Sequence, residues 1–348
     1  MLACLLALIL ATRFVPYGGE FYATCIYPSL SFVLSLLSSF IPCSLEEILV
    51  CLFGALLLLY PLVSLLRRKK HILLGELEIV LWVVAWFYIG WGCNYFRTGF
   101  YERLMITPSD YEKDTFLTFL NAYTDSLNTA YISAELLDRE AARREIKDLY
   151  RQVPPGCGLT TPRSFQEPKK LLFNELYSEV GVLGYMGPFM AESQVNQELS
   201  DMEYPFTYAH ELSHLLGVSN EAEANCWAFL ICSHAENPVI RYSAYNGLLA
   251  YVANNARQIL TPEEFEQWMH TVSTQALDDE KRVSDYWKSR KNATLNSMQE
   301  TLYNLFLKSN NIKNGMQNYT EVVGMLIALQ ESQEEPLRRQ GRALSVKQ

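Results

Sequence analysis

HELSHLLGVSNEAEAN, residues 210–225, places two histidines four residues apart, with a glutamate directly after the first. On an α-helix, His210 and His214 would project from the same face, one turn apart. Two imidazoles in that arrangement can bind one Zn²⁺, each at ~2.0–2.1 Å. Glu211, beside the first histidine, is placed to act as a general base toward a water molecule. The pattern predicts a zinc site with Glu211 as its catalytic residue; the alternative is a surface helix with two solvated histidines.

A catalytic zinc ion needs a third protein ligand and one open coordination position. Gly217 can end the first helix, and a second helix is expected to begin near Glu221. Asn220 suits the N-cap of that helix, with Glu223 completing a capping box. This role would occupy Glu223, so Glu221 is the predicted third ligand and Glu223 the alternative. Asn225, one turn after Glu221, is predicted either to orient a ligand through a hydrogen bond or to be an ordinary polar residue of a half-buried helix.

The charged residues are unevenly distributed along the 348-residue chain, because nearly everything before Arg97 is apolar. Glu47–Leu66 and Leu77–Tyr95 each approach the ~20 residues that cross a ~30 Å hydrocarbon core. Trp and Tyr near the end of the second segment suit a membrane–water interface. Two buried core helices are disfavoured because both segments are apolar on every face. The chain is therefore predicted to divide into a membrane region, residues 1–97, and a water-soluble domain, residues 98–330.

The first 45 residues contribute about one further hydrophobic segment, for three in all. Residues 1–11 are too short to span, and Tyr27–Ile41 mixes serine with large apolar residues, which favours an interfacial or re-entrant helix. Short basic loops stay on the cytoplasmic side of a membrane, and Arg67–His71 (RRKKH) is such a loop. The chain after the second span is therefore predicted to be extracytoplasmic, in a multi-pass protein of the cell membrane.

The domain after Arg97 is predicted to be α+β and mostly helical, with a small sheet. Ser109 and Glu112 resemble a capping box at the start of a helix that runs to about Gln152. Glu179–Phe189 is the best strand candidate. Further helices are expected over Glu221–His234, over Val239–Arg257, from Thr261 with Glu264 completing a capping box, over Asp279–Lys308 and over Tyr319–Gln330; residues 331–348 are predicted to be disordered.

Composition argues against several functions. The net charge of −9 and the lack of a basic stripe disfavour nucleic-acid binding. The eight cysteines include no CxxC pair, so a thiolate zinc site is not expected.

Glu192 is predicted to serve as a helix cap or in a surface salt bridge, with contact to substrate or metal as the alternative. The predicted partners are a peptide or protein substrate and the lipid bilayer.

HELSH followed by EAEAN (Glu221–Asn225) resembles the gluzincin branch of zinc metallopeptidases. The resemblance implies a zincin-like domain that binds one Zn²⁺ through His210, His214 and Glu221. It also implies that Glu211 is the general base and that Asn225 occupies the supporting Asp/Asn position. One feature departs from the pattern: in most gluzincins the ligand glutamate lies twenty or more residues past the second histidine, whereas Glu221 is only seven residues past His214, closer to a metzincin turn.

Nearly the whole chain resembles a bacterial family of membrane-anchored HExxH proteins of unknown function. The resemblance is carried by WGCNYFR (Trp91–Arg97), GYMGPFMAESQVN (Gly184–Asn196) and LKSNNIKNGMQNY (Leu307–Tyr319). It implies a membrane-bound zinc peptidase and supplies no substrate. Tyr319, in the last of these segments, is the tyrosine we single out as a candidate transition-state donor.

These features together predict a membrane-anchored zinc metallopeptidase. An extended substrate would pair with the strand at Val182–Tyr185, for which a core strand or a glycine-containing loop is the alternative. Two other functions stay open from sequence: a non-catalytic zincin-fold envelope sensor or binding protein, and a zinc hydrolase of a non-peptide amide such as those of the cell wall.

Overall fold

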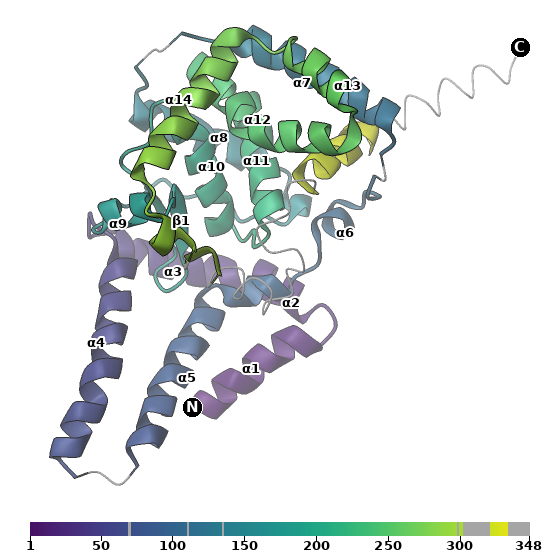
Figure 1. Cartoon of the computed structure of the whole chain (residues 1–348). Coiled ribbons are helices and arrows are strands. Elements are labelled where there is room, and N and C mark those ends of the chain that lie inside the picture. Colours follow the sequence, from purple (N-terminus) through teal and green to yellow (C-terminus); the bar gives the residue numbers. More distant parts are fainter. Residues whose placement is uncertain (69–70, 110, 134–135, 298, 302–320, 333–348) are drawn as a thin grey trace, which may run out of the picture.

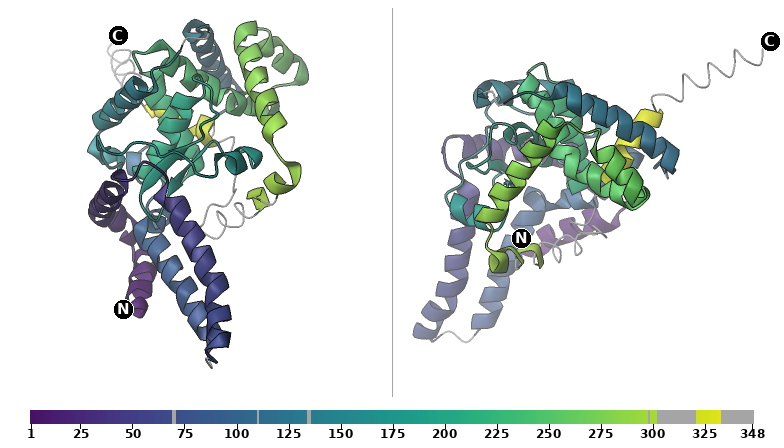
Figure 2. Two further views of the ribbon diagram at one scale, coloured as in Figure 1. Left: turned by 90° about the vertical axis from the view of Figure 1, so that its left-hand side faces the viewer. Right: turned by 45° about the horizontal axis from the view of Figure 1, so that its top comes forward.

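The computed structural model describes residues 1–68, 71–109, 111–133, 136–297, 299–301 and 321–332 (Figure 1). It confirms a mostly helical chain with a small sheet. An N-terminal helical region, residues 1–97, is followed by a compact helical domain that carries the HELSH sequence. Figure 2 shows two long helices of the N-terminal region extending away from this domain.

The two long helices are α4 (Leu45–Leu66) and α5 (Ile72–Gly90), which pack against each other. Both are long and apolar enough to cross a membrane, and both are almost entirely uncovered by the rest of the chain. They contain most of the two predicted spans. The second span was predicted to reach Tyr95, but α5 ends at Gly90 because the chain tightens into the 3₁₀ helix η2 (Gly92–Phe96).

A third helix long and apolar enough to span is Gly18–Ser39, composed of α2 (Gly18–Phe21), the π-helical η1 (Tyr22–Ile26) and α3 (Tyr27–Ser39); the shorter α1 (Leu2–Phe14) precedes it. In Figure 1 this helix runs across the upper ends of α4 and α5, beneath the helical domain. One face makes polar contacts with residues 97–217, through Glu20, Tyr27, Ser35 and Ser38.

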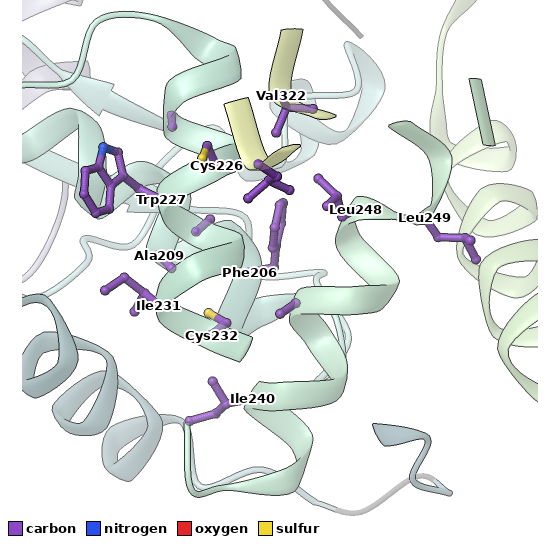
Figure 3. Close-up of a cluster of buried hydrophobic side chains, with 14 of the residues drawn as sticks. Phe206, Ala209, Cys226, Trp227, Ile231, Cys232, Ile240, Leu248, Leu249 and Val322 are labelled. Atoms are coloured by element: carbon purple, nitrogen blue, oxygen red, sulfur yellow. The ribbon is translucent and has the colours of Figure 1, made fainter. Parts of the chain in front are cut away.

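The helical domain is built around three helices that pack on one another: α10 (Tyr204–Leu215), α11 (Glu221–Ser233) and α12 (Pro238–Ile259). Figure 3 shows their contact, with Phe206 and Ala209 facing side chains of α11 and α12. The surrounding helices are α6 (Phe100–Leu104), α7 (Lys113–Ala130), α8 (Arg139–Gln152), α9 (Asn174–Glu179), α13 (Pro262–Met269), α14 (Thr274–Arg290) and a helix over residues 321–332.

The long helical stretch predicted to run to about Gln152 is divided in two, and the predicted capping box of Ser109 and Glu112 is wrong. Two helices occupy this stretch, α7 with Glu112 at its N-cap and α8 with Asp138 at its N-cap. Asp138 accepts hydrogen bonds from the backbone N–H groups of Glu140 and Ala141, so it starts a new helix within a stretch of good helix formers.

Other predicted boundaries also change. The capping box of Thr261 and Glu264 is confirmed. The helix predicted over Asp279–Lys308 begins earlier, at Thr274, and α14 ends at Arg290. Tyr319 and residues 333–348 lie outside the described residues, as does the end of that predicted helix.

The described sheet is one antiparallel hairpin that packs on α10. β1 (Gly184–Gly187) pairs with β2 (Glu192–Val195) in the register Gly184↔Val195, so only four residues of the strand predicted over Glu179–Phe189 are extended. Glu192 of β2 is buried and accepts hydrogen bonds from the backbone N–H groups of Leu45 and Glu46. It therefore caps α4, where a carboxylate also favours the helix dipole, and the predicted alternative of a surface salt bridge is wrong.

Candidate metal centre

The helix that carries both histidines is α10, and its sequence explains both of its ends. Pro205 stands in the first turn, where a missing N–H costs nothing. Gly217 follows the last turn with φ of 102°, the left-handed conformation that ends many helices. The chain then turns within residues 218–220, which brings α11 back beside the histidines.

Glu221 is the first residue of α11. Asn220 caps this helix as predicted, with its Oδ1 accepting from the backbone N–H of Glu223 at 2.9 Å. The Glu223 carboxylate does not return to the cap; it pairs with Arg103 and accepts from Trp227 Nε1. Of the two candidate third ligands, the structure therefore places Glu221 next to the histidines and Glu223 in a buried ion pair.

His210, His214 and Glu221 bring three ligand atoms together. The two Nε2 atoms of the histidines lie 3.0 Å apart. Oε2 of Glu221 lies 3.2 Å from Nε2 of His210 and 3.5 Å from that of His214. A tetrahedral zinc ion with bonds of ~2.0–2.1 Å holds its ligand atoms roughly 3.3 Å apart. The three measured separations fit that geometry.

The hydrogen bonds of the imidazoles make a positive charge at this point necessary. Nδ1 of His214 lies 2.8 Å from the backbone oxygen of Val218, which can only accept, so this nitrogen carries a proton. Nδ1 of His210 lies 2.8 Å from Oδ1 of Asn225 and is a donor by the same reasoning. With a proton on each Nδ1, the two Nε2 atoms face each other and the Glu221 carboxylate, where a metal ion would take the place of the proton on His214. A metal ion fits this donor set, and two imidazoles, a carboxylate and an open position are typical of catalytic zinc.

Glu211 lies on the same helix, buried beneath the β-hairpin. A Cβ added to Gly184 would stand 2.7 Å from Cγ of Glu211 and 2.8 Å from the Gln194 oxygen, so only glycine allows β1 to approach this closely. Burial raises the pKa of Glu211 to about 7; the two histidines act to lower it and Glu221 to raise it. In the metal-free protein this carboxyl group can therefore take and return a proton near neutral pH.

The end of α10 is supported by side chains from the N-terminal helical region. Trp91 Nε1 donates to the backbone oxygen of His214 at 2.9 Å, and the Tyr27 hydroxyl donates to that of Leu215 at 2.8 Å. Arg97 donates to the oxygen of Gly217 at 3.0 Å. The last carbonyls of a helix have no partners within it. Here residues before position 98 provide them, so the site is not a property of the helical domain alone.

Two aromatic residues of this support were not predicted to belong to the site. The Trp91 ring packs edge-on against His214, with 6.4 Å between centroids, and Tyr95 packs edge-on against Trp91 at 5.2 Å. Burial raises the pKa of Tyr95, and the charge of Glu221 adds to that shift. The hydropathy of residues 77–95 assigned both aromatics to a membrane interface. The sequence signal that could have identified them is their place in the WGCNYFR segment.

Comparison with known proteins extends over nearly the whole chain. A family model described as "Protein of unknown function (DUF3810)" matches residues 22–327. The chain belongs to the DUF3810 family. No curated protein and no solved structure matches the chain. The match confirms the predicted kinship with a family of unknown function, and it includes both the N-terminal helices and the HELSH sequence of this DUF3810 protein.

The hydrogen bond from Asn225 to His210 gives a first prediction. Asn225→Ala is expected to weaken zinc binding about 10–100-fold, because His210 loses the acceptor that fixes its ring and tautomer. Asn225→Asp is the matched control, since it keeps an oxygen at the same position and is expected to bind zinc at least as tightly as the parent. Competition with a fluorescent zinc chelator measures all three proteins. Equal affinity for Asn225→Ala and the parent would show that Asn225 does not orient the ligand.

A second prediction concerns protons. Burial favours neutral His214, but the adjacent Glu221 carboxylate outweighs this and raises the pKa of His214 in the metal-free protein to about 9. Zinc must displace that proton, so binding at pH 7 is expected to release at least about one proton per chain. Affinity should then rise with pH, by up to about tenfold per unit, until His214 is neutral without zinc. Calorimetric titration in buffers of different ionisation enthalpy measures the release, and a binding heat independent of buffer would contradict it.

Proposed function

We propose that this DUF3810 protein is a membrane-anchored, zinc-dependent metallopeptidase with a zincin-like domain outside the cytoplasm. The observation that carries the proposal is the convergence of Nε2 of His210, Nε2 of His214 and Oε2 of Glu221 beside buried Glu211. A site that only stored or sensed the metal would need the three ligands and would have no use for Glu211. The three long apolar helices support the anchor, and the basic loop at residues 67–71 supports the orientation.

In the proposed reaction, one water molecule is consumed for each peptide bond that is cleaved. Zinc bound by the three ligands would polarise the carbonyl oxygen and make water more acidic. Glu211 takes a proton from the water molecule as the water oxygen attacks the carbonyl carbon. Glu211 then gives that proton to the amide nitrogen as the C–N bond breaks, which leaves a carboxylic acid and an amine. Asn225 holds the ring of His210, and the Val218 carbonyl holds that of His214.

The test uses the full-length protein purified in detergent, because residues before position 98 support α10. Zinc content is measured by elemental analysis, and the protein is incubated with a mixed-sequence peptide pool whose new termini are read by mass spectrometry. We expect one zinc per chain, cleavage that a chelator abolishes, and recovery when zinc is returned.

The same measurements distinguish a peptidase from the two alternative functions. Stoichiometric zinc without peptide cleavage would contradict the proposal and favour a binding protein or a hydrolase of a non-peptide amide. Absence of zinc from the purified protein, even after supplementation at neutral pH, would contradict the metal site itself.

A further inference from the structure

The position of the metal centre relative to α5 indicates which polypeptides reach it. The 19 residues of α5 rise about 28 Å at ~1.5 Å per residue, close to the ~30 Å thickness of a hydrocarbon core. A spanning α5 would therefore need its whole length to cross, with Gly90 at the membrane surface. Trp91 comes next in the chain and donates to the backbone of the zinc ligand His214. A single tryptophan side chain thus separates the end of the span from the metal helix.

Strand β1 extends from the metal helix α10 to the end of α5. At its start, Gly184 lies against Glu211. After its end, Trp86 Nε1 donates to the Phe189 oxygen at 3.0 Å, and a Cβ on Gly90 would stand 2.6 Å from the Pro188 oxygen. Four residues of strand cover only about 13 Å. A chain that paired with β1 would therefore run from the catalytic glutamate to the membrane surface.

Among the described residues, no strand occupies the second edge of β1. β2 occupies the other edge, and Lys169 adds a parallel bridge beyond β2. No other described strand pairs with β1. Extended peptides commonly bind by adding a strand to an edge of this kind.

Exposed apolar side chains lie on the segments around this end of the molecule. On the Gly18–Ser39 helix, Val33 is 50 % exposed and Leu37 is 56 % exposed. Phe40, just beyond this helix, is 78 % exposed. Phe173 and Leu176 are about half exposed beside α4, where Glu47 accepts from the backbone N–H of Phe173. Apolar side chains next to the ends of spans suit the boundary between headgroups and acyl chains.

We propose that the substrate is a polypeptide anchored in the same bilayer, cut within the first few residues that emerge from it. This rests on the proposed peptidase function and on the insertion of α4 and α5. The first residues of such a chain emerge at the end of α5, where β1 and the metal helix meet the surface. A peptide bond far along the substrate from its membrane anchor would reach the metal centre only if the substrate chain folded back toward the membrane surface.

The test places full-length protein in vesicles of phosphatidylethanolamine and phosphatidylglycerol with three formats of one substrate pool. In the adjacent format, an unstructured mixed-sequence stretch follows a single transmembrane helix directly. In the spaced format, a small folded domain separates the helix from the stretch, so anchoring is equal but the distance from the bilayer is greater. In the free format, the stretch has no helix. New termini are mapped and their rates of appearance compared.

We expect cuts in the adjacent format within about ten residues of the helix, since an extended chain covers ~3.3 Å per residue. The spaced format should be cut at least about tenfold more slowly, although its effective concentration in the membrane is the same. Equal rates for the two anchored formats, or cuts spread evenly along the stretch, would overturn this substrate class while leaving a peptidase. No zinc-dependent cut in any format would count against the peptidase itself and therefore against this inference too.

Discussion

Glu211→Gln is expected to abolish peptide hydrolysis and to leave zinc binding nearly unchanged. Glutamine has the shape of glutamate but cannot accept the proton of the attacking water, and a general base is worth about 10²–10⁴-fold in rate. Glu211 is not among the three converging ligands, so the metal should stay. Rates of terminus formation and zinc content are measured on the same purified sample.

Glu203→Gln is the matched control for this variant. It removes one carboxylate at the N-cap of the same helix, where Glu203 accepts from Ser200 and Trp287, and it should cleave at the rate of the parent. Two outcomes would contradict the assignment of Glu211. Parental activity in Glu211→Gln would show that another group takes the proton. Loss of zinc would show that Glu211 itself binds the metal.

Glu221→Ala is expected to weaken zinc binding by more than about 100-fold, beyond the loss usual for residues that only orient a ligand. The carboxylate lies 3.2 and 3.5 Å from the two Nε2 atoms and is partly exposed, so losing its pairing with protonated His214 should cost the metal-free fold less than leaving a fully buried charge without its partner. Zinc affinity by chelator competition and thermal unfolding of metal-free protein are the two measurements.

Glu223→Gln should show the opposite pattern. It leaves Arg103 buried without its carboxylate partner, which typically costs about 3–5 kcal/mol of folding free energy. The folded fraction should still bind zinc with nearly parental affinity. If Glu223→Gln instead lost zinc and Glu221→Ala kept it, the third ligand would be Glu223, reached by a rearrangement of the first turn of α11.

Local sequence patterns predicted much of the site. The spacing of His210 and His214, the glycine at 217 and the Asn220 cap follow from rules that act within one or two helical turns, and the structure has each of them. The predicted capping box is only half right: Asn220 caps α11, but the Glu223 carboxylate pairs with Arg103, 120 residues away in sequence, which local patterns could not predict.

What the sequence could not predict depends on contacts between distant segments. For Glu192 the sequence predicted a helix cap or a surface salt bridge, and only the fold shows that the helix it caps is α4, where it accepts from Glu46, 146 residues earlier in the chain. Trp91 reads as a membrane-interface aromatic, yet its N–H is paired with His214, 123 residues away. The sequence did not predict the break between α7 and α8, because residues with good helix propensity continue through it. Asp138 caps α8, but it is only one of several residues in this stretch that could have started a helix.

The support of α10 by Tyr27, Trp91 and Arg97 has a consequence for biogenesis. All three donors precede α10 in the sequence, so they are synthesised before it. These donors complete the last turn of the histidine helix, so the proposed metal site is expected to form fully only once they are in place. A mistargeted copy would lack that template, and a fragment shed by a cut after Arg97 would lose it. In both cases the last turn of the histidine helix would be without these three donors, and we expect the proposed metal site to be weakened.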